Sequence, residues 1–429
     1  MDDTTALAHT AAPTEPQQRT LTHRLLLFFA LVYVVEGLGQ IGGLVAQPLN
    51  YYLKEAQSFT PLQITAFITL FNVPWIIKPV YGLVSDFIPL FGYRRKSYLV
   101  IANLAAIAGY LWTATLDTPS QLLLALMITA YAMAISSTLC GAVLVENGHA
   151  LHESGTFVNQ QWLWLNIATM VAAVLGGQLV ERLTPSGALH AAALIVSVAP
   201  LAVVVASLTL IPEKKTTINL TGFKATLAGL TTSFKRRELW IVAGFMFLYY
   251  FSPGLSTPLY FHMTDELKYS QAYIGILGSI SAGGWVVGAL LYRNFLSDMP
   301  LRRLLYLSIA TGTVTTLAYL LLGNEVSAAV IYFCSGFSGM LATVSTLTLA
   351  ADYSPPRAEG FTFAVLMSLI NFANSTADNI GSFLYEHVFT HRLPPLVMIS
   401  AAVTAFAYVL VPLLRLGDKR QGEPAAVMK

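Results

Sequence analysis

Long apolar stretches alternate with short polar segments along the chain. A helix needs about 20 residues to cross the roughly 30 Å apolar core of a bilayer, and twelve stretches reach this length. Continuous apolar runs predict helices rather than the alternating strands of a membrane β-barrel. The predicted spans are 25–50, 61–83, 97–116, 120–146, 159–180, 188–211, 239–263, 271–292, 303–322, 326–350, 361–388 and 394–415.

The composition predicts an all-α polytopic membrane protein and excludes a soluble one. Of the 429 residues, 55% are hydrophobic and 11% are charged, against about 25% charged residues in typical soluble domains. The formal net charge of +2 is too small for a nucleic-acid-binding surface. We therefore expect the lipid bilayer, and no nucleic acid, as a partner.

The basic residues indicate the orientation, because short cytoplasmic connections hold most Lys and Arg residues. One set of connections and the two tails contain Arg19, Arg24, Arg94, Arg95, Lys96, Lys214, Lys215, Lys235, Arg236, Arg237, Arg293, Arg302, Arg303, Arg357, Arg415, Lys419 and Arg420. The other face has Lys54, Arg182, Lys268 and Arg392. We expect both termini to be cytoplasmic in a multi-pass protein of a plasma membrane or bacterial inner membrane.

The longest internal polar segment divides the chain into two halves with six predicted spans each. The expected parts are a cytoplasmic tail at 1–24, a six-helix bundle at 25–211, a cytoplasmic linker at 212–238, a second six-helix bundle at 239–415 and a cytoplasmic tail at 416–429. Bends are expected in spans two and seven, because each proline there removes a backbone donor. These prolines are Pro74, Pro79, Pro253 and Pro258.

The segment GLVSDFIPLFGYRRK after span two resembles the loop signature of the major facilitator superfamily. In that signature a small residue, here Gly82, permits close helix approach, and an acid at a helix end, here Asp86, pairs with loop bases. The bases are Arg94, Arg95 and Lys96. Such an acid can hold the loop and a neighbouring helix end together, which predicts a latch that opens when the two bundles rock.

A degenerate second copy of this signature follows span eight. It reads GALLYRNFLSDMPLRR and contains Arg293, Arg302 and Arg303. Two copies half a chain apart imply an internal repeat, as found in many transporters. The alternative is that both segments are ordinary basic cytoplasmic loops.

The residues from Pro74 to Tyr98 closely resemble the folate-biopterin transporter family within this superfamily. The matching positions are Pro74-Trp75, Lys78-Pro79, Tyr81-Gly82, Ser85-Asp86 and Gly92 to Tyr98. Similar patterns occur in PLYFHMTDEL, in LYRNFLSDMPLRR and in SPPRAEGFTFAVLMSLINFANS, so the resemblance extends along most of the chain. It implies the major facilitator superfamily fold, with twelve transmembrane helices in two pseudo-symmetric six-helix bundles, and a folate or pterin as the transported substrate.

Span four departs from the family pattern. Family members usually carry two acids and a terminal Arg there, whereas this chain has Ser137 and Gly141 at the acidic positions and His149 in place of the Arg. Only Glu146 remains. If the missing acids bind a pterin or couple protons in the family, the identity of the substrate of this chain is open.

Two acids lie near the middle of apolar spans, Glu36 in span one and Asp378 in span eleven. An isolated charge at this depth costs at least ~2.5 kcal/mol and is usually kept for a pathway role. Opposite halves enclose the substrate cavity in this superfamily, so we expect both acids at one central site, for substrate recognition or proton coupling. The alternative is an acid satisfied by helix backbone or local hydroxyl groups.

Four further residues are candidates for the same site. The amides of Asn371 and Asn374 suit the carbonyl edge of a heteroaromatic solute. Lys78 and Glu146 lie nearer the cytoplasmic ends, where structural pairing and substrate contact are both open. No catalytic triad, phosphate loop or metal-ligand motif stands out, so we expect no enzyme activity, no cofactor and no metal.

The sequence therefore predicts a secondary transporter that works by alternating access. Because there is no ATP-binding loop, an ion gradient would have to supply the energy. The coupling ion that we consider is the proton. Alternative substrates are another organic anion or a peptidoglycan fragment. The alternatives of a different class are a non-transporting membrane scaffold and an intramembrane enzyme.

Overall fold

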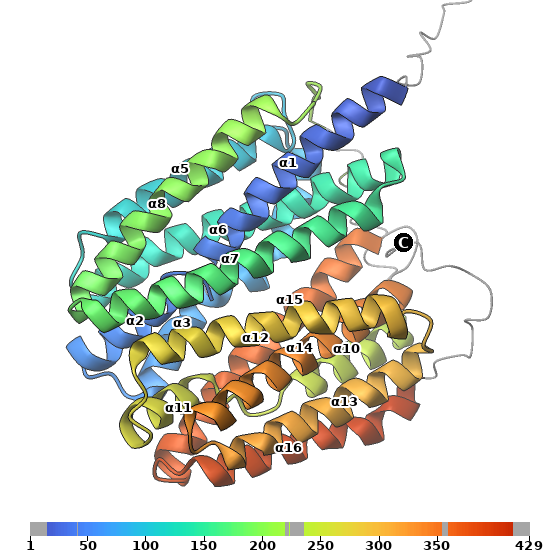
Figure 1. Cartoon of the computed structure of the whole chain (residues 1–429). Coiled ribbons are helices and arrows are strands. Elements are labelled where there is room, and N and C mark those ends of the chain that lie inside the picture. Colours follow the sequence, from blue (N-terminus) through green and yellow to red (C-terminus); the bar gives the residue numbers. More distant parts are fainter. Residues whose placement is uncertain (1–14, 41, 219–222, 224–235, 354–358, 415–429) are drawn as a thin grey trace, which may run out of the picture.

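A computed structural model describes residues 15–40, 42–218, 223, 236–353 and 359–414 of the protein (Figure 1). The first half contains α1 (Glu15–Gly39), α2 (Ala46–Tyr51), α3 (Pro61–Ile76), α4 (Lys78–Phe87), α5 (Lys96–Thr113), α6 (Pro119–Leu151), α7 (Ser154–Arg182) and α8 (Pro185–Thr209). The second half contains α10 (Arg237–Tyr250), α11 (Ser256–Phe261), α12 (Gln271–Leu291), α13 (Leu301–Ala318), α14 (Glu325–Tyr353), α15 (Glu359–Phe383) and α16 (Leu393–Leu410). Within these ranges the only extended pairing is an isolated bridge between Leu90 and Tyr93.

Helices occupy every predicted span, which confirms an all-α membrane fold. In the part of the chain that is described, nine helices are long and apolar enough to cross a membrane. The other three predicted spans correspond to α5, to the interrupted pair α10 and α11, and to α15. The number of twelve crossings stays a prediction.

The helices of the two halves lie on opposite sides of the molecule (Figure 1). In the first half α5 packs against α6 and α8, and α1 packs against α7 and α8. In the second half α13 packs against α14 and α16, and α12 packs against α14. Two helix pairs, α7 with α12 and α3 with α15, carry most of the packing between the halves.

The long helices run between two ends of the molecule, which we name by one residue each. At the Arg95 end, Arg24 of α1 donates to the Thr209 carbonyl of α8. Lys96 of α5 lies at the same end, 3.4 Å from the Leu208 carbonyl oxygen. The Lys54 end is opposite, where α2 is followed by a π-helical turn from Tyr52 to Ala56.

Spans one and seven are interrupted and then continue in the same way. The chain is irregular at residue 40 and from 42 to 45, between α1 and α2, and from 251 to 255, between α10 and α11. After each interruption come a short α-helix, a π-helical turn, a residue with positive φ and a hydroxyl that caps the next helix. The positive-φ residues are Ser58 and Lys268, and the capping residues are Thr60 and Ser270. This recurrence supports an internal repeat.

The predicted bends coincide with breaks in the helices. Span two is divided at Ile77, which lies between α3 and α4 and is flanked by Pro74 and Pro79. The interruption of span seven contains Pro253, and α11 begins just before Pro258. Proline cannot donate a backbone hydrogen bond, so helices break at these points at low cost.

Candidate functional site

Glu36 lies in a buried polar cluster inside the first half. Glu36 is 7% exposed. The Ser137 hydroxyl donates to Oε1 of Glu36 over 2.8 Å, and the Lys78 ammonium donates to Oγ of Ser137 over 3.1 Å. The second carboxylate oxygen, Oε2, is buried and has no hydrogen-bond partner among the described residues. We call Glu36, Trp75, Lys78 and Ser137 the Glu36 cluster.

Trp75 forms the aromatic wall of the Glu36 cluster. The Lys78 ammonium nitrogen lies 4.2 Å from the centre of the Trp75 ring, a cation–π contact. Trp75 is 9% exposed, and its Nε1 donor is buried without a partner in the described part of the chain. The cluster thus contains two opposite charges, Glu36 and Lys78. It also leaves one acceptor, Oε2 of Glu36, and one donor, Nε1 of Trp75, to which a bound solute can form hydrogen bonds.

The two altered positions of span four lie one turn apart on α6. Ser137 bridges Glu36 and Lys78, so a hydroxyl stands where the family usually has an acid. A Cβ at Gly141 would meet nothing within 4 Å, so the second altered position borders open space. Sequence reasoning treated both positions as losses and missed the bridging role of Ser137.

Asp378 lies against the interruption between α10 and α11. A Cβ at Gly254 would lie 1.9 Å from Oδ1 of Asp378, so only glycine allows this approach. The Gly254 N–H donates to the carbonyl of Ala377 over 2.8 Å, and the Ser256 hydroxyl interacts with the Asp378 carboxylate. No described Lys, Arg or His forms an ion pair with Asp378, in contrast to the neighbourhood of Glu36.

A row of amide and hydroxyl contacts joins α3 to α15. Asn371 donates to the carbonyl of Trp75 over 3.1 Å, which connects the second half to the Glu36 cluster. Further contacts along this row are Asn72 to Ser375, Asn379 to Thr69, and the hydroxyls of Thr65, Thr257 and Ser382. Asn374 is exposed and forms no hydrogen bond with another described residue. The structure thus brings Asn371, but not Asn374, to the Glu36 cluster.

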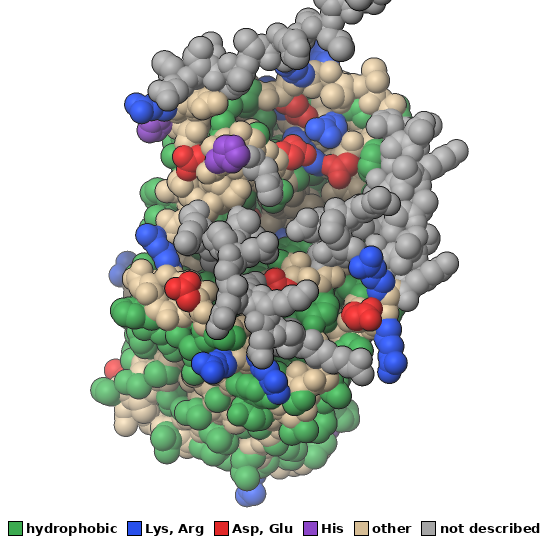
Figure 2. Space-filling view, turned by 90° about the vertical axis from the view of Figure 1, so that its right-hand side faces the viewer, with side chains coloured by type: hydrophobic (Ala, Val, Ile, Leu, Met, Phe, Trp, Pro, Cys, Tyr) green, Lys and Arg blue, Asp and Glu red, His purple; other side chains and the backbone are tan. Residues whose placement is uncertain are grey.

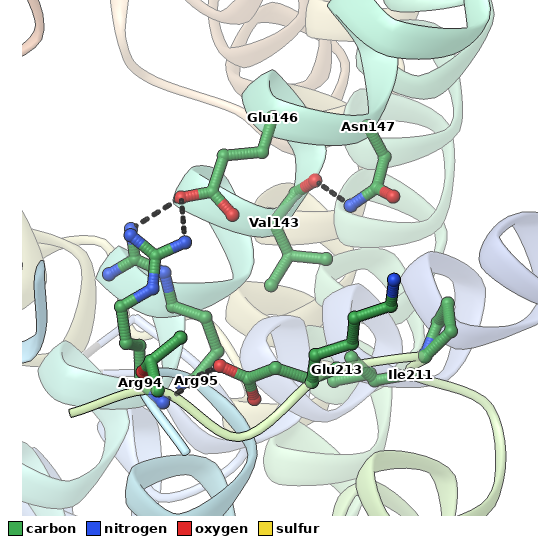
Figure 3. Close-up of a pocket in the computed structure, with 10 residues that line it drawn as sticks. Arg94, Arg95, Val143, Glu146, Asn147, Ile211 and Glu213 are labelled. Carbon is green, nitrogen blue, oxygen red and sulfur yellow. Dashed lines mark hydrogen bonds and ion pairs between the residues drawn. The ribbon is translucent and has the colours of Figure 1, made fainter. Parts of the chain in front are cut away.

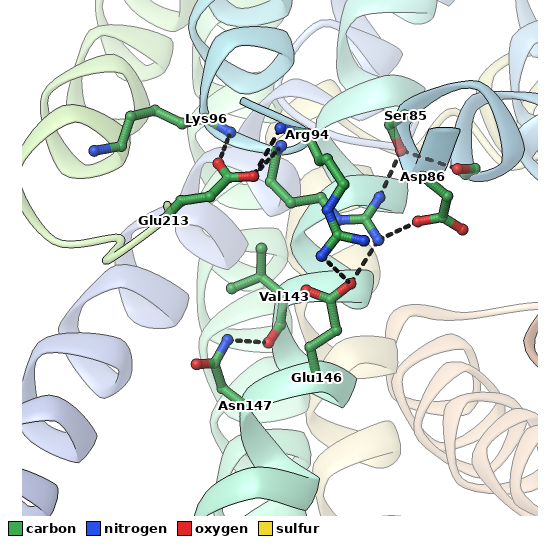
Figure 4. Close-up of polar contacts among 10 residues, drawn as sticks. Ser85, Asp86, Arg94, Lys96, Val143, Glu146, Asn147 and Glu213 are labelled. Atoms are coloured by element: carbon green, nitrogen blue, oxygen red, sulfur yellow. Dashed lines mark hydrogen bonds and ion pairs between the residues drawn. The ribbon is translucent and has the colours of Figure 1, made fainter. Parts of the chain in front are cut away.

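The residues of the predicted latch meet at Arg95, which is 4% exposed. Figure 4 shows its partners Ser85, Asp86 and Glu146. Its guanidinium group donates to Asp86, to Oε1 of Glu146 over 2.7 Å and to the Ser85 hydroxyl over 2.5 Å. Arg94 lies 4.0 Å from the same oxygen of Glu146. Glu146 is therefore part of the latch rather than of the Glu36 cluster.

The charge of Arg95 is held by its two carboxylate partners. Burial by itself lowers the pKa of Arg95, but Asp86 and Glu146 outweigh it, so the pKa lies above its ordinary value. Gly82 lies one turn before Asp86, where a Cβ would be 3.8 Å from the Thr138 side chain on α6. This is an ordinary van der Waals distance, so the packing of α4 on α6 does not by itself require a glycine here, and the role of Gly82 stays a prediction.

The second copy of the signature is not assembled in the same way. Arg293, Arg302 and Arg303 are exposed. No ion pair joins them to Asp298 or to another residue in the described ranges.

Glu213, which sequence reasoning missed, binds the loop that carries the latch (Figure 4). Its Oε1 accepts the backbone N–H groups of Arg94 and Arg95 over 2.7 and 2.9 Å, and its Oε2 accepts that of Lys96 over 2.8 Å. A cavity of about 250 Å³ lies beside these contacts (Figure 3). The charged residues that line it are Arg94, Arg95, Glu146, Glu213 and Lys214.

One sequence signal could have found Glu213. The helix that starts at the lysine of GYRRK has Arg95 at its N-cap, whereas Ser, Thr, Asp or Asn is preferred there as a hydrogen-bond acceptor. An acid directly after span six, at the same predicted end of the molecule, was available to supply it.

Among the described residues, the ion pair between the halves lies at the Lys54 end, beyond the row of amide and hydroxyl contacts between α3 and α15. Lys54 pairs with Asp265 and donates to the Thr264 hydroxyl over 2.6 Å. Gln47 donates to the Gln271 carbonyl over 2.7 Å. At the Arg95 end, every ion pair between described residues lies within the first half. Figure 2, which faces the end where α1 begins, shows acidic and basic side chains over the parts of this face formed by both halves.

The comparison with protein families decides the kind of protein. The sequence model described as the BT1 family matches residues 38–421. The chain belongs to the BT1 family. Relatives include the folate-biopterin transporter of Synechocystis sp., which is 28% identical and for which the alignment covers 84% of this chain and 74% of the relative. The probable folate-biopterin transporter 6 of Arabidopsis thaliana is 25% identical, with 85% and 77% covered.

Solved structures show the fold of this BT1 protein. The nucleoside transporter NupG superposes with a TM-score of 0.65 at 16% identity and covers 94% of this chain and all 100% of its own. A D-xylose-proton symporter superposes with a TM-score of 0.66 at 12% identity, covering 91% and 96%. These findings confirm the folate-biopterin resemblance, the major facilitator fold and a membrane transporter rather than an enzyme.

Proposed function

We propose that this BT1 protein is a secondary active transporter of a folate or pterin. The observation that carries the proposal is the Glu36 carboxylate, which is buried beside Lys78 while its Oε2 has no partner among the described residues. A buried acceptor without a partner costs about 1–3 kcal/mol, so a solute that donates to it gains affinity. The names of the relatives from Synechocystis and Arabidopsis support the same substrate class.

A pterin ring suits the Glu36 cluster. Its amino-pyrimidine edge offers N–H donors to Oε2 of Glu36, and its carbonyl oxygen suits the Lys78 ammonium or the Asn371 amide. The Trp75 ring offers a surface for a flat solute. The second candidate is another small organic anion, which Ser137 and Gly141 favour because they replace the acids usual in the family.

We propose that the two bundles, 25–211 and 239–415, rock about the site, joined by the cytoplasmic linker 212–238. In this proposal the twelve spans place the Arg95 end and both termini in the cytoplasm, because the basic clusters lie there. The contacts of Lys54 and Gln47 then close the outer side. The latch around Arg95 helps to set which side is open.

Asp378 is the proposed coupling site. A buried carboxylate without a cation is costly in its charged form, and a proton removes this cost. Glu36 has Lys78 nearby, whereas Asp378 interacts with the Ser256 hydroxyl and forms no ion pair with a described Lys, Arg or His. In this proposal Glu36 binds the solute and Asp378 binds the coupling proton.

Reconstitution in liposomes tests the proposal. We expect saturable uptake of radiolabelled folic acid or tetrahydrobiopterin when the proton concentration is higher on the outer side. Glu36→Gln should abolish this uptake, and an unrelated anion such as p-aminohippurate is the control. If no folate or pterin binds, competes or accumulates while another anion is transported, the substrate assignment fails and the transporter remains.

A further inference from the structure

Glu213 caps α5 from a distant part of the chain. The first N–H groups of a helix have no partner within the helix, and a carboxylate is favoured there by charge and by the helix dipole. Arg95 occupies the N-cap position, but its side chain makes no capping bond. Glu213 accepts three consecutive backbone N–H groups, those of residues 94–96, and so supplies the missing cap.

Arg95 connects this cap to the latch. Its backbone N–H donates to Glu213, while its guanidinium group holds Asp86 and Glu146. The position of the backbone at Arg95 decides whether the guanidinium group reaches both carboxylates. A shift of the loop by a fraction of the hydrogen-bond length would separate these partners, because charge-assisted bonds are short and directional.

A second contact holds the linker along the same loop. The Thr216 N–H donates to the carbonyl of Gly92 over 2.8 Å. Gly92 has a φ of +84°, and a Cβ there would lie 3.3 Å from the Lys215 side chain, so glycine serves both the turn and the close approach. The linker is therefore attached on both sides of Lys215 before it continues towards α10, which begins at Arg237.

We infer that Glu213 is a positioning residue of the transport cycle, which ties the linker between the halves to the latch. When the halves move at the Arg95 end, a shift of the segment 213–216 moves the backbone of residues 94–96 with it and so changes the alignment of Arg95 with its carboxylates. The inference rests on the proposed rocking of the two bundles. It differs from a plain tether, which would leave the latch unchanged when its contact is broken.

Limited proteolysis of the full-length protein in nanodiscs tests whether the linker is docked. Glu213→Gln should speed trypsin cleavage after Lys215 about tenfold, since a charged acceptor of three hydrogen bonds is lost. Cleavage after Arg236 should not change. Free peptides covering 209–219, with and without the substitution, correct for any direct effect on trypsin.

Hydrogen exchange and transport test whether docking positions the latch. In Glu213→Gln the amides of residues 94–96 should exchange at least about tenfold faster, and the turnover number for folate should fall while its KM stays the same. Glu213→Asp, which keeps the charge, should restore part of both. Glu153→Gln, at the same end and without an ion pair to another described residue, is the matched control.

Each outcome decides the inference. Unchanged cleavage and unchanged exchange would show that Glu213 neither docks the linker nor fixes the backbone of residues 94–96, and would overturn the inference. Faster cleavage with unchanged exchange at residues 94–96 would reduce Glu213 to a tether and overturn its positioning role. Both readouts are independent of the substrate, so a failure of folate transport in the native protein would contradict the proposed function without deciding this inference.

Discussion

Lys54 of the first half forms an ion pair with Asp265 of the second half. The Lys54 side chain is 10% exposed, and its ammonium nitrogen also lies 4.9 Å from the centre of the Phe261 ring. The pair therefore joins the halves where water is largely excluded from one partner, and an ion pair of this kind contributes more than a fully exposed one.

Removing this contact should open the Lys54 end. Lys54→Gln is expected to raise the population open at that end about fivefold, which corresponds to about 1 kcal/mol for a partly exposed ion pair. The measurement is the rate at which a membrane-impermeant maleimide labels a cysteine placed at Thr69, within the interface of α3 and α15.

The controls for this experiment use the same cysteine in a protein without Cys140 and Cys334. The charge exchange Lys54→Asp with Asp265→Lys should restore slow labelling. Arg182→Gln removes an exposed charge at the same end and should have no effect. Equal labelling rates in native and Lys54→Gln proteins would contradict a closing role.

Glu36→Gln should weaken solute binding more than it weakens the fold. The amide replaces a charged acceptor and presents a donor to the solute, so we expect the Kd for a pterin to rise at least about tenfold. Quenching of tryptophan fluorescence offers a direct measurement, because Trp75 belongs to the cluster. Native affinity in this variant would remove Glu36 from the site.

Asp378→Asn should uncouple transport from the proton gradient. A permanently neutral side chain mimics the protonated acid, so exchange of labelled for unlabelled solute continues while accumulation against a gradient is lost. Uptake by the native protein should rise as the outer pH falls, and uptake by the variant should not respond. Glu325→Gln, an exposed acid, is the control. A variant that still accumulates solute would refute the assignment.

The neighbouring residues Arg94 and Arg95 should contribute unequally to the free energy of unfolding. Arg95→Gln leaves Asp86 and Glu146 without their shared cation and should lower the free energy of unfolding by about 2 kcal/mol. Arg94→Gln removes only an exposed contact at 4.0 Å and should cost less than about 0.5 kcal/mol. Thermal unfolding of the two variants in the same detergent compares them directly, and equal losses would argue against a latch centred on Arg95.

Two glycines near the interruption of span seven should respond differently to alanine. Gly254→Ala places a methyl group 1.9 Å from Oδ1 of Asp378, and overpacking of this kind typically costs about 1–3 kcal/mol. Gly244→Ala meets nothing within 4 Å and favours the helix, so it should be neutral or stabilising. The melting temperatures of the two variants provide the test. A stable Gly254→Ala protein with native transport would mean that Asp378 need not approach the interruption.

The sequence by itself determined the membrane fold and the loop that carries the latch. In a bilayer the backbone can bond only to itself, so apolar runs of bilayer length form helices, and each predicted span contains a helix. The pairing of Asp86 with Arg95 was also predictable, because both residues lie on one short connection. The resemblance to the folate-biopterin transporters followed from a continuous motif, which does not depend on how the helices pack.

Only the tertiary structure decided which distant side chains meet. Ser137 reaches Glu36, and Glu213 reaches Arg95, across more than a hundred residues of sequence. Glu146 pairs at the latch, and Asn374 turns away from the Glu36 cluster, because helix rotation and packing set the direction of each side chain. A sequence pattern gives the face of one helix but not the neighbour that it meets, and the site is made of such encounters.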